Sequence, residues 1–192
     1  MIPTRKDAWI LLSRYNKSES LLKHALSVEA VMRHFASLFN EDVEKWGVIG
    51  LIHDLDYEQY PDQHCKMTRK ILEEEQWPEE YIHAVVSHGW GICSDTEPTH
   101  LMEKVLFTID ELTGLVTASV LIRPSKSIYE LELKSVKKKW PLKNFAAGAN
   151  REVIEKGAAM MGKELDFIIQ ETITGMKTAA VEIGLEGVGS RE

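Results

Sequence analysis

Cysteine is scarce in this sequence, since Cys65 and Cys93 are the only two among 192 residues. They lie far apart in the chain and form no Cys-x-x-Cys arrangement, so the sequence indicates no soft thiolate metal site. No export signal is recognisable, and an oxidising compartment is therefore not expected. We expect two free, buried thiols that act as small apolar fillers rather than a disulfide.

Long apolar runs and an excess of positive charge are also missing. The apolar stretch at residues 9–12 is too short for the core of a signal peptide, and no run approaches the length of a membrane span. The 23 Lys and Arg stand against 30 Asp and Glu, a net charge of −7, which disfavours binding to DNA, RNA or anionic lipid. We expect a cytoplasmic protein that binds neither membranes nor large nucleic acids. A small phosphorylated ligand stays compatible, because metal ions and a few local cations can hold it.

Strand patterns are nearly absent, and apolar residues instead recur at the three- and four-residue steps of helices. The pattern predicts helices over residues 21–39, 41–52, 62–76, 78–88, 100–119, 147–161 and 164–183, with a short one after Ser127. Hydrophobic residues make up 44% of the chain, enough for a sizeable core. We expect an all-α fold with a core at residues 1–123, including an N-terminal helix. A helical extension at residues 124–192 would pack on this core and end in a loose tail from Gly184.

Several polar residues stand where these helices are most apolar. His24 falls on the apolar stripe of its helix, and Asp110 lies on the apolar face of a later one. His53 and Asp54 directly follow an apolar run, where a buried helix leaves the core. A buried imidazole or carboxylate is costly to desolvate unless it is hydrogen-bonded, paired or bound to metal. Each alone has an ordinary explanation as a core residue, but together they offer the donors of a Mn, Fe, Co, Ni or Zn site.

The order His24, His53-Asp54, Asp110 resembles the H…HD…D signature of the HD-domain superfamily of metal-dependent phosphohydrolases. The resemblance covers roughly residues 20 to 120 and includes the segment Ser87-His88-Gly89. The remainder looks like the C-terminal region of small bacterial HDIG-type proteins. Asp56 stands where the HDIG motif has its glycine, which weakens a match to the cyclic-dinucleotide phosphodiesterases. The resemblance implies a single all-α HD-type domain with a C-terminal helical extension.

The family pattern also implies a set of metal ligands. Four residues would hold one divalent transition-metal ion, or Mg²⁺: His24, His53, Asp54 and Asp110. His64 and His88 match, by order and spacing, the positions that hold a second ion in two-metal members, with Asp54 bridging. One ion and two ions both stay open. His83 is left out, because its side chain points about 140° around the helix from that of His88.

The implied activity is hydrolysis of a small phosphate ester, most plausibly a nucleotide, by a metal-activated water. Asp54 would be central to the chemistry, and Asp56 is a candidate for orienting the water or moving protons. An exposed turn residue is an equally good interpretation of Asp56. Phosphate oxygens also need cations. Four basic residues are candidates from their proximity in sequence: Lys66, Arg69, Arg123 and Lys126.

Two other classes of function fit the same ligands. Some proteins of HD-like fold hold two irons and carry out O₂-dependent oxidation, and ligand identity alone does not separate them from hydrolases. A non-catalytic helical module that binds an effector in the pocket is the third class. The intact set of His24, the His53-Asp54 pair and Asp110 argues against that third class.

Overall fold

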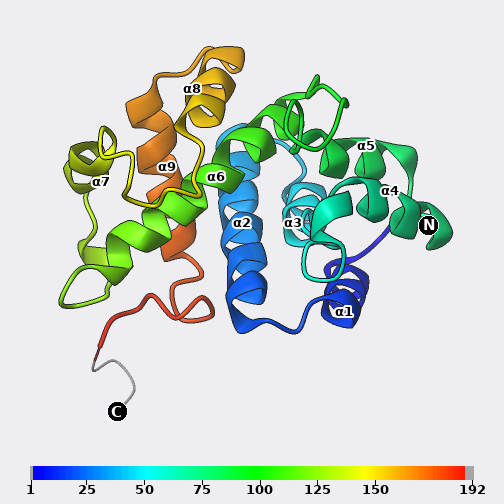
Figure 1. The fold of residues 1–192 in the computed structure, drawn as a ribbon, viewed down its shortest axis with the longest axis horizontal. Coiled ribbons are helices and arrows are strands. Elements are labelled where there is room, and N and C mark those ends of the chain that lie inside the picture. Colours follow the sequence, from blue (N-terminus) through cyan, green and yellow to red (C-terminus); the bar gives the residue numbers. More distant parts are fainter. Residues whose placement is uncertain (1, 189–192) are drawn as a thin grey trace.

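The chain folds into helices alone, as Figure 1 shows for a computed structural model that describes residues 2–188. Within that range there are nine α-helices, two short 3-10 helices and no β-strand, which confirms the predicted all-α fold. The α-helices are α1 (Arg5–Tyr15), α2 (Glu19–Leu38), α3 (Val43–Ile52), α4 (Lys66–Glu74), α5 (Glu79–Ser87), α6 (Leu101–Leu121), α7 (Leu133–Lys139), α8 (Arg151–Met160) and α9 (Leu165–Lys177). The 3-10 helices are η1 (Pro61–Gln63) and η2 (Ile128–Glu130).

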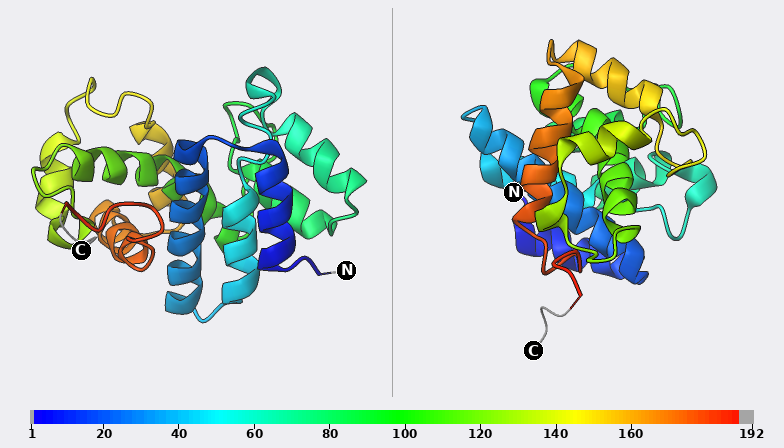
Figure 2. Two further views of the ribbon diagram at one scale, coloured as in Figure 1. Left: turned by 90° about the horizontal axis from the view of Figure 1, so that it is seen from below. Right: turned by 90° about the vertical axis from the view of Figure 1, so that its left-hand side faces the viewer.

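Two long helices, α2 and α6, occupy the centre of the molecule. Helix α2 packs against α3, α6 and α9, and α6 packs against α8, α7 and α9. Helices α1, α3, α4 and α5 therefore lie on one side of α2, and α7 to α9 lie on the other (Figures 1 and 2). The C-terminal helices cover part of both central helices, as an extension packed on a core would. The division of the chain after residue 123 stays a prediction.

Helix ends follow recognisable capping chemistry. Helix α1 begins with a capping box, in which Thr4 accepts the amide hydrogen of Asp7 and the Asp7 carboxylate accepts that of Thr4. Helix α6 begins in a similar way, with His100 as the N-cap and Glu103 accepting the amide hydrogen of His100. These caps fix where the two helices start, and hence the register of the side chains along them.

The helix predicted from Asp62 begins later than expected. Residues Pro61–Gln63 form the 3-10 helix η1, and α4 starts only at Lys66. Between them, Cys65 has a φ of 65°, a left-handed conformation that is unusual for a residue other than glycine and cannot continue a helix. His64 therefore lies in an irregular segment rather than on the first turn of a helix.

The tail predicted to be loose is packed as far as it is described. Leu185 is buried, and its carbonyl oxygen accepts the amide hydrogen of Ile128 at 2.8 Å. The amide of Val188 donates to the carbonyl oxygen of Ser125 at 2.9 Å. The rest of that prediction, residues 189–192, lies outside the described residues. In the part of the chain that the structure covers, no helix is both long enough and apolar enough for a membrane span.

Candidate metal centre

The His53-Asp54 pair stands at the C-terminal end of α3, a helix that is buried from Trp46 to Ile52. Gly50 allows α3 to approach α2 closely, because a Cβ there would meet the Met32 side chain at 2.8 Å. Close packing of the two helices places His53 against His24, which lies on α2. His53 itself is fully buried.

Three side chains from three helices form what we call the inner cluster: His24 of α2, His53 at the end of α3 and Asp110 of α6. The Nε2 atoms of His24 and His53 are 3.2 Å apart. Oδ1 of Asp110 is 2.9 Å from Nε2 of His24 and 3.3 Å from Nε2 of His53. These three donor atoms point at a common position and can hold a metal ion.

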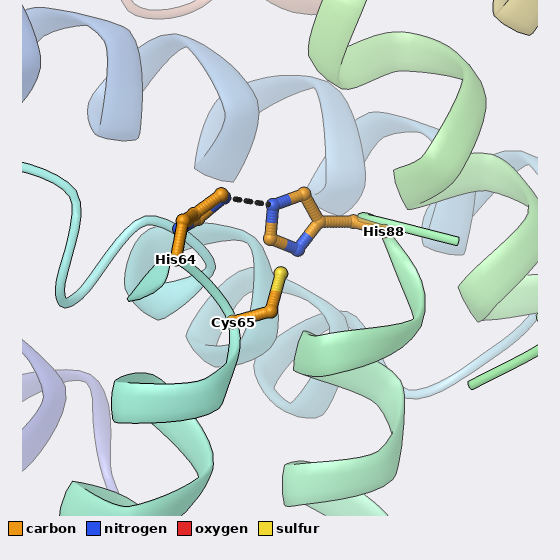
Figure 3. Close-up of side chains that lie close together, drawn as sticks. All are labelled: His64, Cys65 and His88. Atoms are coloured by element: carbon orange, nitrogen blue, oxygen red, sulfur yellow. Dashed lines mark hydrogen bonds between the residues drawn. The ribbon is translucent and has the colours of Figure 1, made fainter. Parts of the chain in front are cut away.

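His64 and His88 form a second group, the outer cluster. His64 follows η1, and His88 is the C-cap residue of α5. Their Nε2 atoms are 3.1 Å apart and their rings are tilted by 57° to each other, and Figure 3 shows the Cys65 side chain pointing toward the ring of His88. His64, His88 and the neighbouring Cys65 each offer one possible ligand atom, and these three atoms lie within 4.8 Å of one another.

Asp54 lies between the two clusters and faces each with one oxygen. Its Oδ2 is 3.6 Å from Nε2 of His24 and 3.4 Å from Nε2 of His53. Its Oδ1 is 3.4 Å from Nε2 of His64 and 3.5 Å from Nε2 of His88. A carboxylate in this position can bridge two ions. The structure thus brings together all six residues that the sequence analysis selected as metal ligands.

The hydrogen bonds of the outer cluster fix which ring nitrogen carries a proton. Nδ1 of His64 is 2.7 Å from Oδ1 of Asp56, and Nδ1 of His88 is 2.6 Å from the carbonyl oxygen of Val85. Both oxygens accept, so each Nδ1 donates, and each neutral ring then has a lone pair on Nε2. Two lone pairs that face each other at 3.1 Å repel unless a cation or a proton lies with them.

The inner cluster has the same character. Nδ1 of His53 donates to the carbonyl oxygen of Gly50 at 2.8 Å. Thr113 gives its hydroxyl hydrogen to the carbonyl oxygen of Asp110, so its Oγ1 can accept from Nδ1 of His24. The Nε2 lone pairs of His24 and His53 then converge with an oxygen of Asp110. None of these three ligand atoms carries a hydrogen, and two nitrogens with one carboxylate oxygen suit a divalent transition metal.

The pKa shifts of the buried groups also indicate that positive charge is favoured at this site. Burial alone would lower the pKa of His53, but the charges of Asp54 and Asp110 raise it well above its usual value. Burial would raise the pKa of both carboxyls, yet the neighbouring His53 holds each well below its usual range. Burial opposes protonation of His64 too, and its hydrogen bond to Asp56 raises its pKa. Without metal, protons on His53 and His64 balance the buried carboxylates.

The burial of Asp56 excludes one of the two interpretations given for it. Its side chain is fully buried, so it is not an exposed turn residue. It does not line the cavity described below; its Oδ1 accepts from His64, and its Oδ2 accepts the amide hydrogen of Thr68 at 2.8 Å. Asp56 therefore acts through His64: it fixes the tautomer and the orientation of that ring, and it makes the ring more basic.

A cavity of about 480 Å³ opens on both clusters. Its lining includes five of the six candidate ligands: His24, Asp54, His64, His88 and Asp110. Small residues form another part of its wall: Gly114, Ala118, Ala146, Gly148 and Ala149. The segment that carries Ala146, Gly148 and Ala149 joins α7 to α8, so the C-terminal part of the chain helps to enclose the site.

None of the four basic residues predicted to bind phosphate lines this cavity. Lys66 and Arg69 line a separate cavity of about 140 Å³, and Arg69 forms ion pairs with Glu73 and Glu79. Arg123 pairs with Glu130, and Lys126 is exposed in the turn that follows α6. Proximity in sequence misled the prediction, because α4 carries Lys66 and Arg69 away from the cavity, and Arg123 and Lys126 lie beyond the end of α6.

Sequence reasoning missed two residues at the cavity. Glu111 lines it, and its Oε2 accepts the amide hydrogen of Asn150 at 2.8 Å. Burial raises the pKa of the Glu111 carboxyl. Cys93 also lines the cavity and is exposed, whereas we expected it to be buried. Both positions depend on contacts between distant segments, which helical periodicity does not reveal.

His83 does not line the cavity of the two clusters, in agreement with its exclusion from the predicted ligands. Nδ1 of His83 is 2.8 Å from Oε1 of Glu103, and His83 lines a different cavity together with Lys45 and Glu80. His83 therefore contributes to neither cluster.

The sequence profile of the HD domain family matches residues 21–115. This span runs from the start of α2 into α6 and contains all six candidate ligands. Comparisons with curated proteins and with solved structures give no significant match.

Proposed function

We propose that this chain, an HD-domain protein by its residues 21–115, is a hydrolase that cleaves a small phosphate ester with the help of two divalent ions. The observation that carries the proposal is the position of Asp54, with one carboxylate oxygen toward each pair of imidazole nitrogens. A single ion would contact only one of the two clusters and one oxygen of Asp54. The facing nitrogens of the second pair, His64 and His88, would then be left without an ion.

In this proposal, the inner cluster and Asp54 hold one ion, while Asp54 and the outer cluster hold the other. When bound, such ions lower the pKa of water and polarise a phosphoryl oxygen. Asp56 keeps His64 in the tautomer that leaves Nε2 free for metal. The imidazole-rich set favours Mn²⁺, Fe²⁺, Co²⁺, Ni²⁺ or Zn²⁺ over Mg²⁺, which prefers oxygen ligands.

The cavity supports a small substrate with a single phosphate group. Its volume of about 480 Å³ is in the range of small-molecule sites. No Lys or Arg belongs to its lining as described, whereas Asp54, Asp110 and Glu111 do. Only the ions can then neutralise phosphate oxygens, and each further phosphate group would add repulsion from Glu111. A nucleoside monophosphate or a similar monoester fits better than a triphosphate.

The test is a screen for phosphate release. Metal-free protein is reloaded with each of Mn²⁺, Co²⁺, Ni²⁺, Zn²⁺ and Mg²⁺ and offered phosphomonoesters, nucleoside mono-, di- and triphosphates, and cyclic nucleotides. We expect release from monoesters with a transition metal and little from triphosphates. No release from any substrate would contradict the proposal. Consumption of O₂ by the iron-loaded protein would then identify an oxygenase, and tight ligand binding without turnover would identify an effector-binding module.

A further inference from the structure

The two cysteines meet beside the outer cluster, although they are distant in sequence. Their Sγ atoms are 3.2 Å apart, and both thiols are free. Cys65 directly follows His64, and Cys93 belongs to the turn that follows His88. Gly89 lies against both sulfurs, and a side chain at that position would collide with them. The absence of a side chain at Gly89 is what allows the two thiols to approach.

We propose that Cys65 and Cys93 are a modification site, in which a peroxide oxidises the two thiols to a disulfide and thereby weakens the binding of an ion to the outer cluster. Disulfide formation requires only the thiol pair. Its effect on metal rests on the proposed two-ion centre.

The reaction proceeds in two balanced steps. The Cys93 thiol loses its proton, the thiolate attacks one oxygen of hydrogen peroxide and the O–O bond breaks; the leaving hydroxide takes up that proton, and the products are a sulfenic acid and water. The Cys65 thiol then loses its proton, its thiolate attacks the Cys93 sulfur and the S–O bond breaks; the leaving hydroxide takes up that proton and departs as a second water. Two thiols have lost two electrons and two protons, and the peroxide has been reduced to two waters. A dithiol reductant reverses the change by thiol–disulfide exchange.

The positions of the two thiols suit these unequal roles. Cys93 is exposed and lines the cavity, so a dissolved peroxide reaches it. Cys65 is only 2% exposed and can react only with a partner inside the protein. The turn keeps them together, because the amides of Cys93 and Ser94 both donate to the carbonyl oxygen of Gly89, at 2.9 and 3.1 Å. The pair is therefore held in contact before any oxidant arrives.

Closing the bond strains the outer cluster rather than the inner one. The Sγ atoms must move from 3.2 Å to about 2.05 Å. Cys65 is buried, and Gly89 lies against both sulfurs. The movement therefore passes to its neighbours His64 and Gly89, and Gly89 is bonded directly to His88. Neither cysteine is close in sequence to His24, His53 or Asp110.

The experiment uses full-length protein loaded with Zn²⁺, which is redox-inactive. The protein is treated with hydrogen peroxide, and free thiols, disulfide-linked peptides and bound zinc are measured before and after addition of dithiothreitol. We expect both thiols to disappear together, a peptide cross-link between Cys65 and Cys93, and a fall in zinc from two ions per chain toward one. The reductant should restore all three.

Cys93→Ser is the matched control, since it removes the exposed thiol and keeps Cys65. It should form no intramolecular disulfide and should keep both zinc ions in peroxide. Cys65→Ser should keep both ions in reducing buffer, and a loss of zinc there would make Cys65 a metal ligand and overturn the proposal. Thiols that survive peroxide, or a disulfide that leaves the zinc content unchanged, would overturn it too. Phosphate release is not among these readouts, so an inactive protein that passes them would contradict the proposed function alone.

Discussion

The inner cluster is carried by three helices of the core, whereas the outer cluster is carried by segments at the ends of helices. His24 and Asp110 lie within α2 and α6, and His53 ends the buried helix α3. His64 stands between η1 and α4, and His88 ends α5 beside a tight turn. Packing of the core thus fixes the inner donors, while single hydrogen bonds such as that from His64 to Asp56 fix the outer ones. We expect the inner site to be the more rigid and the outer site to respond more readily to change.

Asp54→Ala should affect both sites equally, because one oxygen of this carboxylate faces each cluster. We expect the purified variant to lose both ions and phosphate release to fall to background, with the helical circular-dichroism spectrum largely retained. Metal analysis and a phosphate assay measure this, with Asp54→Asn as the isosteric control. Full activity in Asp54→Ala would refute the assignment of the site.

Single histidine variants should separate the two sites. His53→Ala should remove the inner ion and, by opening a cavity among core helices, lower the free energy of unfolding of the metal-free protein by about 2 kcal/mol. His64→Ala and His88→Ala should each reduce the metal content from two ions to one, with a smaller loss of stability. Metal content and denaturant titration test both. An unchanged metal-to-protein ratio in both outer variants would reduce the centre to one ion.

Asp56→Asn should weaken the outer site without emptying it. An amide can accept from His64, but its NH₂ group would then face the amide hydrogen of Thr68, which needs an acceptor. Loss of such a supporting carboxylate lowers metal affinity by about 10- to 100-fold. Competition with a chelator should show this loss for one ion and no change for the other. Equal weakening of both ions would show that the two sites are not independent.

The pH dependence should be strongest at the inner cluster. The pKa of His53 is raised well above its usual value and that of His64 is raised less far. Metal must displace these protons, so metal affinity should increase as the pH rises through and above about 6.5. Stability of the metal-free protein should change in the opposite direction. A raised folded-state pKa stabilises the fold below the unfolded pKa, and this gain is lost as the pH rises through the folded value.

Thermal melting from pH 6 to 9, with and without metal, measures both trends. We expect the melting temperature of the metal-free protein to fall with pH and the difference between the two forms to grow. His53→Ala should flatten the trend of the metal-free protein more than His64→Ala. A metal-free protein that becomes more stable across this range would contradict the charge balance described above.

Part of the centre was predictable from helical periodicity, while His64 and His88 were selected through the resemblance to the HD family. His24 and Asp110 stand out as polar residues on apolar faces, and the His53-Asp54 pair ends an apolar run. Contacts across the chain were not predictable. The cover of Glu111 by the segment before α8 and the contact of Cys65 with Cys93 depend on tertiary packing.

Local backbone conformation and the direction of side chains could not be predicted from the sequence either. The left-handed Cys65 breaks a segment that reads as one helix. The direction in which Lys66 and Arg69 project is decided by where α4 begins, and sequence reasoning placed that start too early. Asp56 has no apolar pattern around it that would reveal its complete burial.

The wall formed by Ala146, Gly148 and Ala149 lies outside the span that matches the HD family. All candidate ligands therefore lie within the matched span, whereas part of the cavity wall lies in a later stretch of the sequence. Substitutions in the later stretch can therefore reshape the cavity without replacing any candidate ligand. A protein engineer who trims the chain to residues 21–115 would keep every candidate ligand and lose that wall.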